Sequence, residues 1–122
     1  MKRDVLLFIQ DIKESINDIE SFSKGLTKDN FIKNRLRQNA IVRSLEIIGE
    51  AVKNIPDSFR NNHPEVPWRK IAGFKDVLSH AYFGVNIERV WNIIVEDLSN
   101  LKKEIEKIKA EDDRSNIINR KK

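Results

Sequence analysis

Apolar residues recur in the first part of the chain at the spacing of one helix face. The steps between them are three or four residues, which is the period of an amphipathic helix. The series is Val5, Ile9, Ile12, Ile16, Ile19 and Phe22. Gly25 suits a helix C-terminus and Thr27 suits an N-cap, so the spacing predicts a first helix that ends near Gly25.

A second apolar stripe predicts a helix from about Thr27 to about Asn54. Its clearest part is Ile41, Leu45, Ile48, Val52 and Ile55. Pro56 closes this helix because proline cannot continue helical hydrogen bonding. Residues 56–67 contain three prolines and two adjacent asparagines. We therefore expect irregular chain there, with one helical turn at 57–60.

Two further helices are expected after the proline-rich stretch. Pro67 and Trp68 suit the start of a helix that runs to about Tyr82 and ends at Gly84. Asn86 can then cap the last helix. The last stripe keeps an unbroken heptad rhythm. It consists of Ile87, Trp91, Ile94, Leu98, Leu101, Ile105 and Ile108.

Four main helices with one apolar stripe each must bury these stripes against one another. The expected architecture is therefore all-α, an up-down bundle of four helices that forms one domain over residues 1–122. The last stripe is longer than the third helix could cover. That length favours a dimer, although tilted packing within one chain would also cover the stripe. Residues 111–122 are polar and are expected to form a frayed tail.

Composition narrows the class of protein. Hydrophobic residues make up 39% of the 122 residues and charged residues 34%, which is too apolar for a disordered chain and too charged for a membrane protein. The N-terminal residues do not resemble a signal peptide, so we expect a cytoplasmic protein without a membrane partner. The net charge of +4 permits RNA as a partner without establishing it. With no cysteine and two distant histidines, we expect no metal and no cofactor.

Residues 73–84 are the stretch that most suggests chemistry. On a helical wheel, one side of this stretch and of the preceding turn is apolar and forms the expected core face. That side holds Ile71, Phe74, Val77, Leu78 and Ala81. The opposite side holds Ala72, Gly73, Asp76, Ser79, His80 and Phe83. Several of these residues are small, so the side fits either the close approach of a phosphate or a helix–helix packing seam.

Asp76 and His80 are one helical turn apart, within reach of a carboxylate–imidazole hydrogen bond. Such a bond would fix the histidine tautomer and favour its charged form. A lone histidine on a helix usually has no catalytic role, so the residues alone leave both interpretations open. Lys75 and Tyr82 lie together on a flank of the wheel.

Three blocks of sequence resemble the HEPN family, and in particular its HepT branch. The motif block is Lys75, four residues, His80, one residue and Tyr82, which is similar to the family's arginine, four to six residues and His-x-Tyr. Residues 43–51, RSLEIIGEA, are similar to its second-helix pattern. Residues 68–73, WRKIAG, also fit, together with FGV directly after the motif. The order and spacing of these blocks cover nearly the whole chain.

The resemblance implies a HEPN helical bundle, usually a homodimer with a cleft between the two motif helices. It implies a toxin that cleaves RNA as a metal-independent endoribonuclease, with a minimal nucleotidyltransferase antitoxin as its partner. His80 would transfer the proton, Asp76 would orient it, and Lys75 would stabilise charge on the phosphate. The family's His-x-Tyr tyrosine accepts AMP from the antitoxin, which implies Tyr82 as the modification site.

Lys75 stands where the family has arginine. An ammonium group is a point charge, whereas a guanidinium group offers a planar fork to phosphate. This departure keeps a second hypothesis open, namely a non-catalytic binding partner of a nucleotidyltransferase with a weakened nuclease. A purely structural dimerising bundle is a third.

Arg43, Glu46 and Glu50 follow helical spacing on the second predicted helix. One interpretation is a solvated face with ion pairs three or four residues apart. The other is that, together with Ser79, they support the motif helix from behind the site. The sequence leaves the two interpretations open.

The remaining aromatic and charged residues have simpler interpretations. Trp68 and Trp91 are expected to be core anchors, with base stacking as the alternative. His63 precedes a proline in a turn and is expected on the surface. The charged run at residues 102–107 is expected on a solvated helix face.

Overall fold

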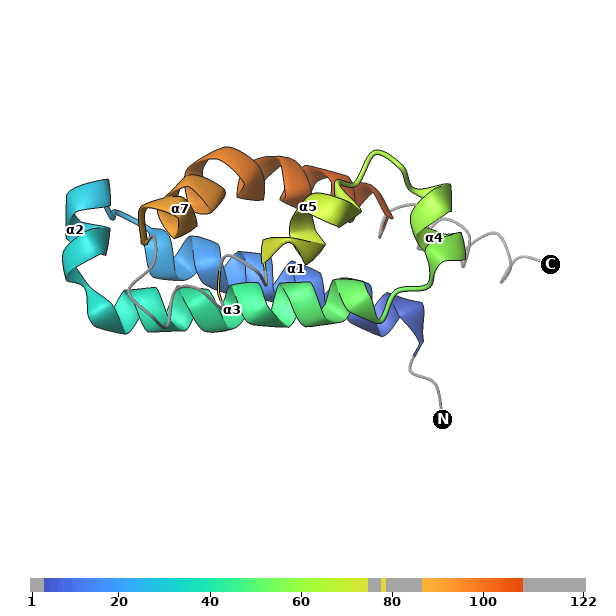
Figure 1. The fold of residues 1–122 in the computed structure, drawn as a ribbon, viewed down its shortest axis with the longest axis horizontal. Coiled ribbons are helices and arrows are strands. Elements are labelled where there is room, and N and C mark those ends of the chain that lie inside the picture. Colours follow the sequence, from blue (N-terminus) through green and yellow to red (C-terminus); the bar gives the residue numbers. More distant parts are fainter. Residues whose placement is uncertain (1–3, 75–77, 79–86, 109–122) are drawn as a thin grey trace, which may run out of the picture.

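The computed structural model of the chain describes residues 4–74, 78 and 87–108. Every regular element in these residues is helical, as the hydrophobic pattern predicts (Figure 1). Residues 98–108 continue the last helix, and no helix in these ranges is long and apolar enough to cross a membrane. The elements are α1 (Val5–Ser23), α2 (Lys28–Lys33), α3 (Arg35–Lys53), α4 (Asp57–Asn62), α5 (Trp68–Ala72), α7 (Ile87–Asn92) and the π-helix η1 (Ile93–Asp97).

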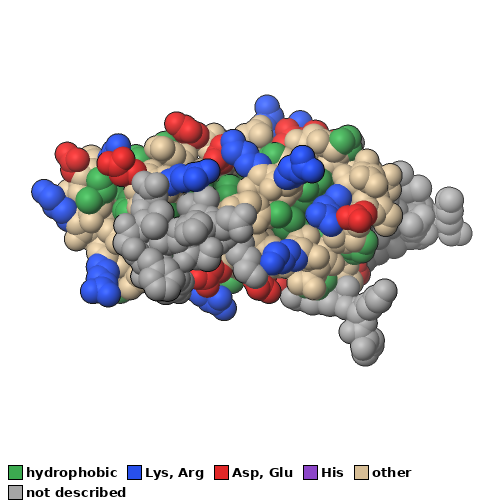
Figure 2. Space-filling model, in the orientation of Figure 1, with side chains coloured by type: hydrophobic (Ala, Val, Ile, Leu, Met, Phe, Trp, Pro, Cys, Tyr) green, Lys and Arg blue, Asp and Glu red, His purple; other side chains and the backbone are tan. Residues whose placement is uncertain are grey.

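The long helices α1 and α3 lie side by side in opposite directions (Figure 1). The last helix, from α7 through η1 to residue 108, shares one hydrophobic core with them. The middle of the stripe predicted for the first helix and the clearest part of the second stripe are confirmed as core. Their residues, each at most 3% exposed, are Ile9, Ile12, Ile16, Ile19, Ile41, Leu45, Ile48, Val52 and Ile55. Burial of each such side chain contributes about 1.5–3 kcal/mol. The prediction is wrong at the two ends of the first stripe, because Val5 is only partly buried and Phe22 is 37% exposed. Acidic and basic side chains are scattered over the face shown in Figure 2, among apolar and uncharged polar surface.

The second predicted helix is interrupted at Asn34, so the prediction of one continuous helix is wrong. Thr27 caps α2 through its side-chain oxygen, as expected. Asn34 then ends α2, because its N–H donates to the Phe31 carbonyl at 3.1 Å. It also begins α3, because its Oδ1 accepts from the Arg37 N–H at 3.0 Å. An asparagine side chain competes for backbone hydrogen bonds, so one residue can end a helix and start the next.

The third predicted helix begins after Pro67 as expected but is divided at Gly73. The N–H of Gly73 closes α5 by donating to the Arg69 carbonyl at 3.0 Å. Phe74 and Leu78 are helical again. The predicted end of this helix near Tyr82 lies outside the described residues. The helical turn expected within residues 56–67 is confirmed as α4.

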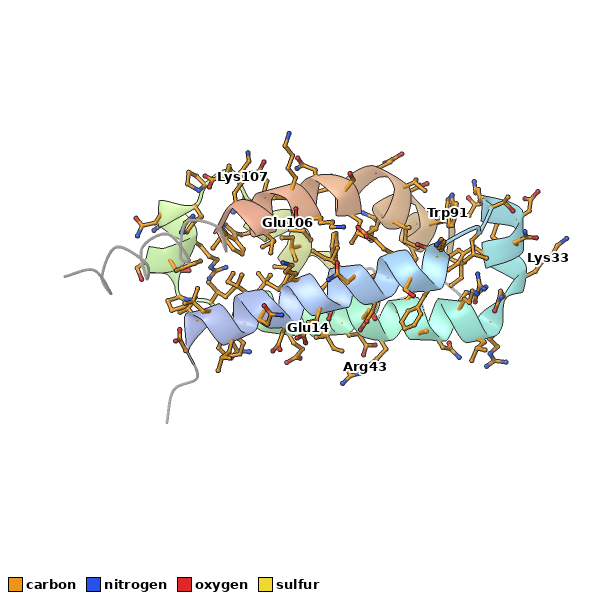
Figure 3. The ribbon with its side chains drawn as sticks, turned by 180° about the vertical axis from the view of Figure 1, so that it is seen from behind. Glu14, Lys33, Arg43, Trp91, Glu106 and Lys107 are labelled. Atoms are coloured by element: carbon orange, nitrogen blue, oxygen red, sulfur yellow. The ribbon has the colours of Figure 1, made fainter. Side chains whose placement is uncertain are left out.

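The last helix contains one π-helical turn, η1, which breaks the predicted heptad rhythm. The buried residues are Val90 and Ile93 up to the turn, and Leu98, Leu101, Ile105 and Ile108 after it. An α-helix would bring position 97 to the core after Ile93, whereas the wider turn brings Leu98 there. Trp91 and Ile94 were predicted to be in the core and are only partly buried against it. Figure 3 shows Trp91 between α7 and α2, where its ring centroid is 5.4 Å from that of Phe31.

The second half of the last stripe does not need a dimer to cover it. Its residues Leu98, Leu101, Ile105 and Ile108 are at most 3% exposed within the single chain. Packing within the chain, which was the alternative to a dimer, therefore covers this half, whereas Ile87, Trp91 and Ile94 of the first half are only partly buried.

The charged run at residues 102–107 is not simply a solvated face. The Lys102 Nζ lies 2.9 Å from the Glu20 carboxylate of α1, and this hydrogen bond raises the pKa of Lys102 above its ordinary value. Glu104 is 8% exposed, and its carboxylate lies 3.2 Å from the Lys107 Nζ. The run therefore ties the last helix to α1 in addition to facing water.

Candidate functional site

The motif lies within residues 75–86. We call the described residues next to it and within it the frame. The frame consists of α5 before the motif, the buried residues Phe74 and Leu78, and α7 with η1 after it. The expected cap Asn86 and the tail 111–122 lie outside the described residues. So do the predicted site residues Lys75, Asp76, Ser79, His80 and Tyr82.

The core face predicted for the motif helix is confirmed where the structure describes it. Ile71, Phe74 and Leu78 are 1%, 4% and 2% exposed. Their spacing of three and four residues is that of one helix face. Gly73 stands between the first two, where a Cβ atom would lie 3.2 Å from the Lys70 carbonyl oxygen. The chain directly before the motif is therefore packed against the core through Ile71 and Phe74.

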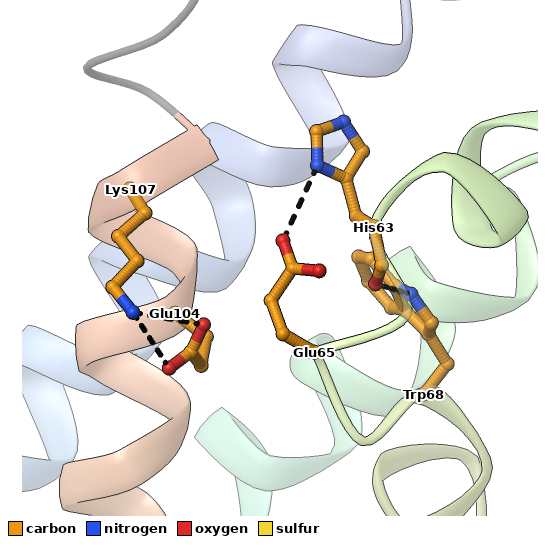
Figure 4. A network of polar contacts seen from close by, with 5 residues as sticks. All are labelled: His63, Glu65, Trp68, Glu104 and Lys107. Carbon is orange, nitrogen blue, oxygen red and sulfur yellow. Dashed lines mark hydrogen bonds and ion pairs between the residues drawn. The ribbon is translucent and has the colours of Figure 1, made fainter.

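Trp68 anchors α5 to the loop that precedes it. It is 8% exposed, which confirms the predicted core anchor, and its Nε1–H donates to the His63 carbonyl at 2.9 Å (Figure 4). His63 is partly buried, which corrects the prediction of a surface residue. Its ring centroid lies 4.6 Å from that of Phe59, and its Nδ1 lies 3.7 Å from the Glu65 carboxylate (Figure 4). The loop before the motif is therefore packed by aromatic side chains.

An ion pair joins the two sides of the frame. The Lys70 Nζ on α5 lies 2.7 Å from the Asp97 Oδ1 at the end of η1. The hydrogen bond and the charge of Asp97 raise the pKa of the Lys70 ammonium group above its ordinary value, which favours its charged form. The π-helical turn is what frees Asp97 for this pair, because it gives the core position to Leu98. Periodicity could not reveal this contact, since it depends on the extra residue of η1.

For Arg43, Glu46 and Glu50 of α3, the structure confirms in part the interpretation of a solvated face with ion pairs. The Arg43 Nη1 lies 3.2 Å from the Glu46 Oε2, an ion pair three residues apart. The Arg43 side chain is 70% exposed and points outward in Figure 3. Glu50 is also exposed. Ser79 lies outside the described residues, and the other interpretation, that these residues support the motif helix, stays a prediction.

A cavity of about 840 Å³ lies between α4 and α5, directly before the motif. Its lining includes three cations, Arg60, Arg69 and Lys70, and one carboxylate, Asp57, which forms an ion pair with Arg60. The Nε of Arg60 is buried without a hydrogen-bond partner in the described ranges. This group of cations was not predicted from the sequence. The only signal available was basic residues on both sides of a proline-rich loop.

Comparison with known proteins agrees with the three sequence blocks. The chain matches the family described as "Ribonuclease HepT-like" over residues 12–108. That span includes both sides of the frame and the whole motif. No solved structure was found to match the chain.

Several named proteins are similar over most of their length. "Putative RNase MJ0127" of Methanocaldococcus jannaschii is 48% identical over 107 residues, which are 88% of each chain. "Probable ribonuclease HepT" of Thermococcus cleftensis is 44% identical over 109 residues, 89% of this chain and 99% of that protein. "Putative RNase TTE0752" of Caldanaerobacter subterraneus is 48% identical over 85 residues, 70% and 76% of the two chains. The chain therefore belongs to the HepT-like ribonuclease family.

Proposed function

We propose that this protein is the toxin of a HEPN/nucleotidyltransferase toxin–antitoxin system and a metal-independent endoribonuclease. The observation that carries the proposal is the block of Lys75, His80 and Tyr82 inside a family match that spans residues 12–108. The names of its relatives agree with RNA as the substrate. The test is cleavage of a structured RNA or a tRNA in EDTA, since a metal-independent enzyme keeps its activity there.

The proposed reaction uses the RNA itself as the nucleophile. The 2′-hydroxyl attacks the neighbouring phosphorus, a bond forms between O2′ and P, and the bond from P to the 5′-oxygen breaks. The 2′-proton passes to a base, and the leaving oxygen takes a proton from an acid. In this proposal His80 transfers protons, Asp76 orients the imidazole, and Lys75 stabilises the negative charge that develops on the phosphate.

The described frame supports this assignment in one respect. Catalytic side chains work best on rigid elements, because small displacements cost large factors in rate. Here Phe74, directly before the motif, and Leu78, within it, are both buried, and the Lys70–Asp97 ion pair joins the elements on either side of the motif. Buried positions of this kind suit a site that must hold a histidine and a cation in register.

The proposed active form is a homodimer. The proposal rests on the family resemblance and on the small residues that the helical wheel groups with Ser79. A site that needs both a base and an acid is well served by two facing motif helices. Light scattering is expected to give a dimer at micromolar concentration and a monomer for Ser79→Trp with unchanged helicity. A wild-type monomer would contradict this.

A second function is favoured by one observation, the lysine at position 75. On this alternative, the domain docks a nucleotidyltransferase and has lost efficient cleavage, because an ammonium group lacks the bidentate geometry of guanidinium. Lys75→Arg separates the two ideas. If the site is degraded, the variant is expected to cleave RNA at least tenfold faster than wild type in single-turnover assays, an estimate from about 1.4 kcal/mol of added charge-assisted hydrogen bonding.

Equal or lower cleavage by Lys75→Arg would favour a site that works with lysine as it stands. Lys70→Arg is a suitable control, because Lys70 lies on the frame, is paired with Asp97, and an arginine keeps the positive charge there. The control is expected to leave the rate unchanged within about twofold, as expected for an exposed ion pair.

A further inference from the structure

A second basic cavity lies at the opposite end of the bundle, where α2 meets α3. It measures about 560 Å³, and four cations line it: Lys24, Lys33, Arg35 and Arg37. The rest of its lining is two asparagines, one glycine and Leu26, with no acidic side chain. Figure 3 shows Lys33 projecting from this end of the molecule. We call the four cations and their cavity the α2–α3 corner.

Two bends in the backbone assemble the α2–α3 corner. Gly25 has a positive φ of 75°, which reverses the chain after α1 and leaves Lys24 at the cavity. Asn34 ends α2 and starts α3, which places Lys33 and Arg35 on either side of one turn. The corner is thus built by the same Asn34 break that the sequence analysis missed.

The cations of the α2–α3 corner make no ion pair or side-chain hydrogen bond with the part of the chain that the structure describes. By contrast, Lys28, Lys70 and Lys102 each lie within 4 Å of a carboxylate. Four like charges around one cavity repel one another, and a bound anion would offset that repulsion. The described part of the chain therefore leaves the four cations of the corner without a counter-charge.

The lining of the α2–α3 corner is strongly basic, since it carries four cations and no acid. The whole sequence is also basic, with a formal net charge of +4. A localised positive field of this kind attracts a polyanion to one place rather than to the whole surface.

The lining indicates the chemical class of the ligand. Cavities for small organic molecules are lined mainly by apolar and aromatic side chains. Leu26 is the one apolar side chain in the lining here. Lysine and arginine side chains are instead the usual donors to the phosphates of nucleic acids.

Helix α2, which contributes Lys33 to the corner, also contacts the element that follows the motif in the sequence. The Lys28 Nζ of α2 lies 3.8 Å from the Glu88 carboxylate of α7, and Phe31 of α2 contacts Trp91 of α7. α7 begins at Ile87, directly after the motif in the sequence.

We propose that the α2–α3 corner binds the sugar–phosphate backbone of RNA at a distance from the cleaved bond. The choice of RNA as the polyanion rests on the proposed function. The corner takes part in substrate binding and not in the chemical step. It lies outside the motif and recognises phosphates, so its contribution is independent of sequence and decreases with salt.

The test compares two pairs of lysines in the full-length chain. Both pairs are placed in a His80→Ala background, so that RNA is bound without being cut. Lys24→Gln/Lys33→Gln removes two charges from the corner, and Lys13→Gln/Lys103→Gln removes two charges from positions that line neither cavity. Fluorescence anisotropy with a labelled single-stranded RNA reports the Kd over a range of salt concentrations.

The corner pair is expected to bind RNA about tenfold more weakly at 0.1 M salt, with the slope of log K against log salt reduced by about 1.4. The control pair is expected to stay within about twofold of its parent. Lys24→Arg/Lys33→Arg is expected to retain the affinity, which would exclude misfolding as the cause.

Three outcomes would overturn the proposal. One is equal weakening in both glutamine pairs, which would mean a net-charge effect. Another is unchanged binding in the corner pair. The third is displacement of RNA by an equal concentration of AMP, which would mean a mononucleotide site. Failure of the proposed function looks different, since a chain that binds RNA through the corner and does not cut it contradicts only the endoribonuclease assignment.

Discussion

Replacing His80 with alanine is expected to lower the rate of RNA cleavage in EDTA by about 10²- to 10⁴-fold, the usual contribution of a general acid–base residue. The 2′-hydroxyl has to lose its proton as it attacks, and His80 is the proposed acceptor. Without the imidazole, the proton passes to water, which is a far weaker base. Single-turnover rates on a structured RNA or a tRNA measure the change.

The chain supplies its own control for this variant. The only other histidine is His63, which lies in the loop before α5 and packs against Phe59. His63→Gln keeps a polar side chain there and is expected to cut RNA at the wild-type rate. Equal cleavage by wild type and His80→Ala would remove His80 from the mechanism, whatever the rate of the control.

Co-expression with a nucleotidyltransferase of the proposed antitoxin class is expected to add AMP groups to the wild-type protein and none to Tyr82→Phe. Tyr82 is the only tyrosine in the chain, so the substitution removes the only phenolic hydroxyl group. Intact mass spectrometry would detect additions in steps of one AMP. Modification that survives in Tyr82→Phe would assign the acceptor to another residue type.

The physical effect of this modification follows from charge and size. A nucleotide attached two residues after His80 would bring a negative charge and a bulky base close to the motif along the chain. Both would oppose the approach of RNA phosphates. We therefore expect the modified protein to lose cleavage of the same RNA that the unmodified protein cuts. Full activity in the modified protein would contradict a silencing role.

The helix faces could be predicted from the sequence because burial follows a fixed period. Ile12 of α1 and Leu45 of α3 stand at the centres of their stripes, and both are fully buried. The helix breaks could not be predicted in this way. Asn34 ends one helix and starts another through two local hydrogen bonds. Such bonds compete with continuous helical hydrogen bonding without changing the apolar pattern. The apolar pattern likewise gives no sign of the division at Gly73.

In the candidate site, too, features set by local spacing could be predicted, whereas contacts between separate helices could not. Local spacing was enough to predict that Phe74 and Leu78 share the core face. The contact between Lys70 and Asp97 joins residues on separate helices and depends on a π-helical turn that adds one residue. The α2–α3 corner likewise depends on two bends that bring Lys24 to Lys33. Periodicity within one helix contains no information about such contacts.

The ends of the cleaved RNA give the most direct test of metal-independent cleavage by the 2′-hydroxyl. Wild-type protein in EDTA is expected to produce a 2′,3′-cyclic phosphate and a free 5′-hydroxyl, identified by mass spectrometry of the fragments. A matched RNA with a single 2′-deoxy sugar before the cleaved bond is expected to stay intact at that bond. Cleavage of the deoxy substrate at the same position, or no cleavage of either RNA in EDTA, would contradict the proposed function.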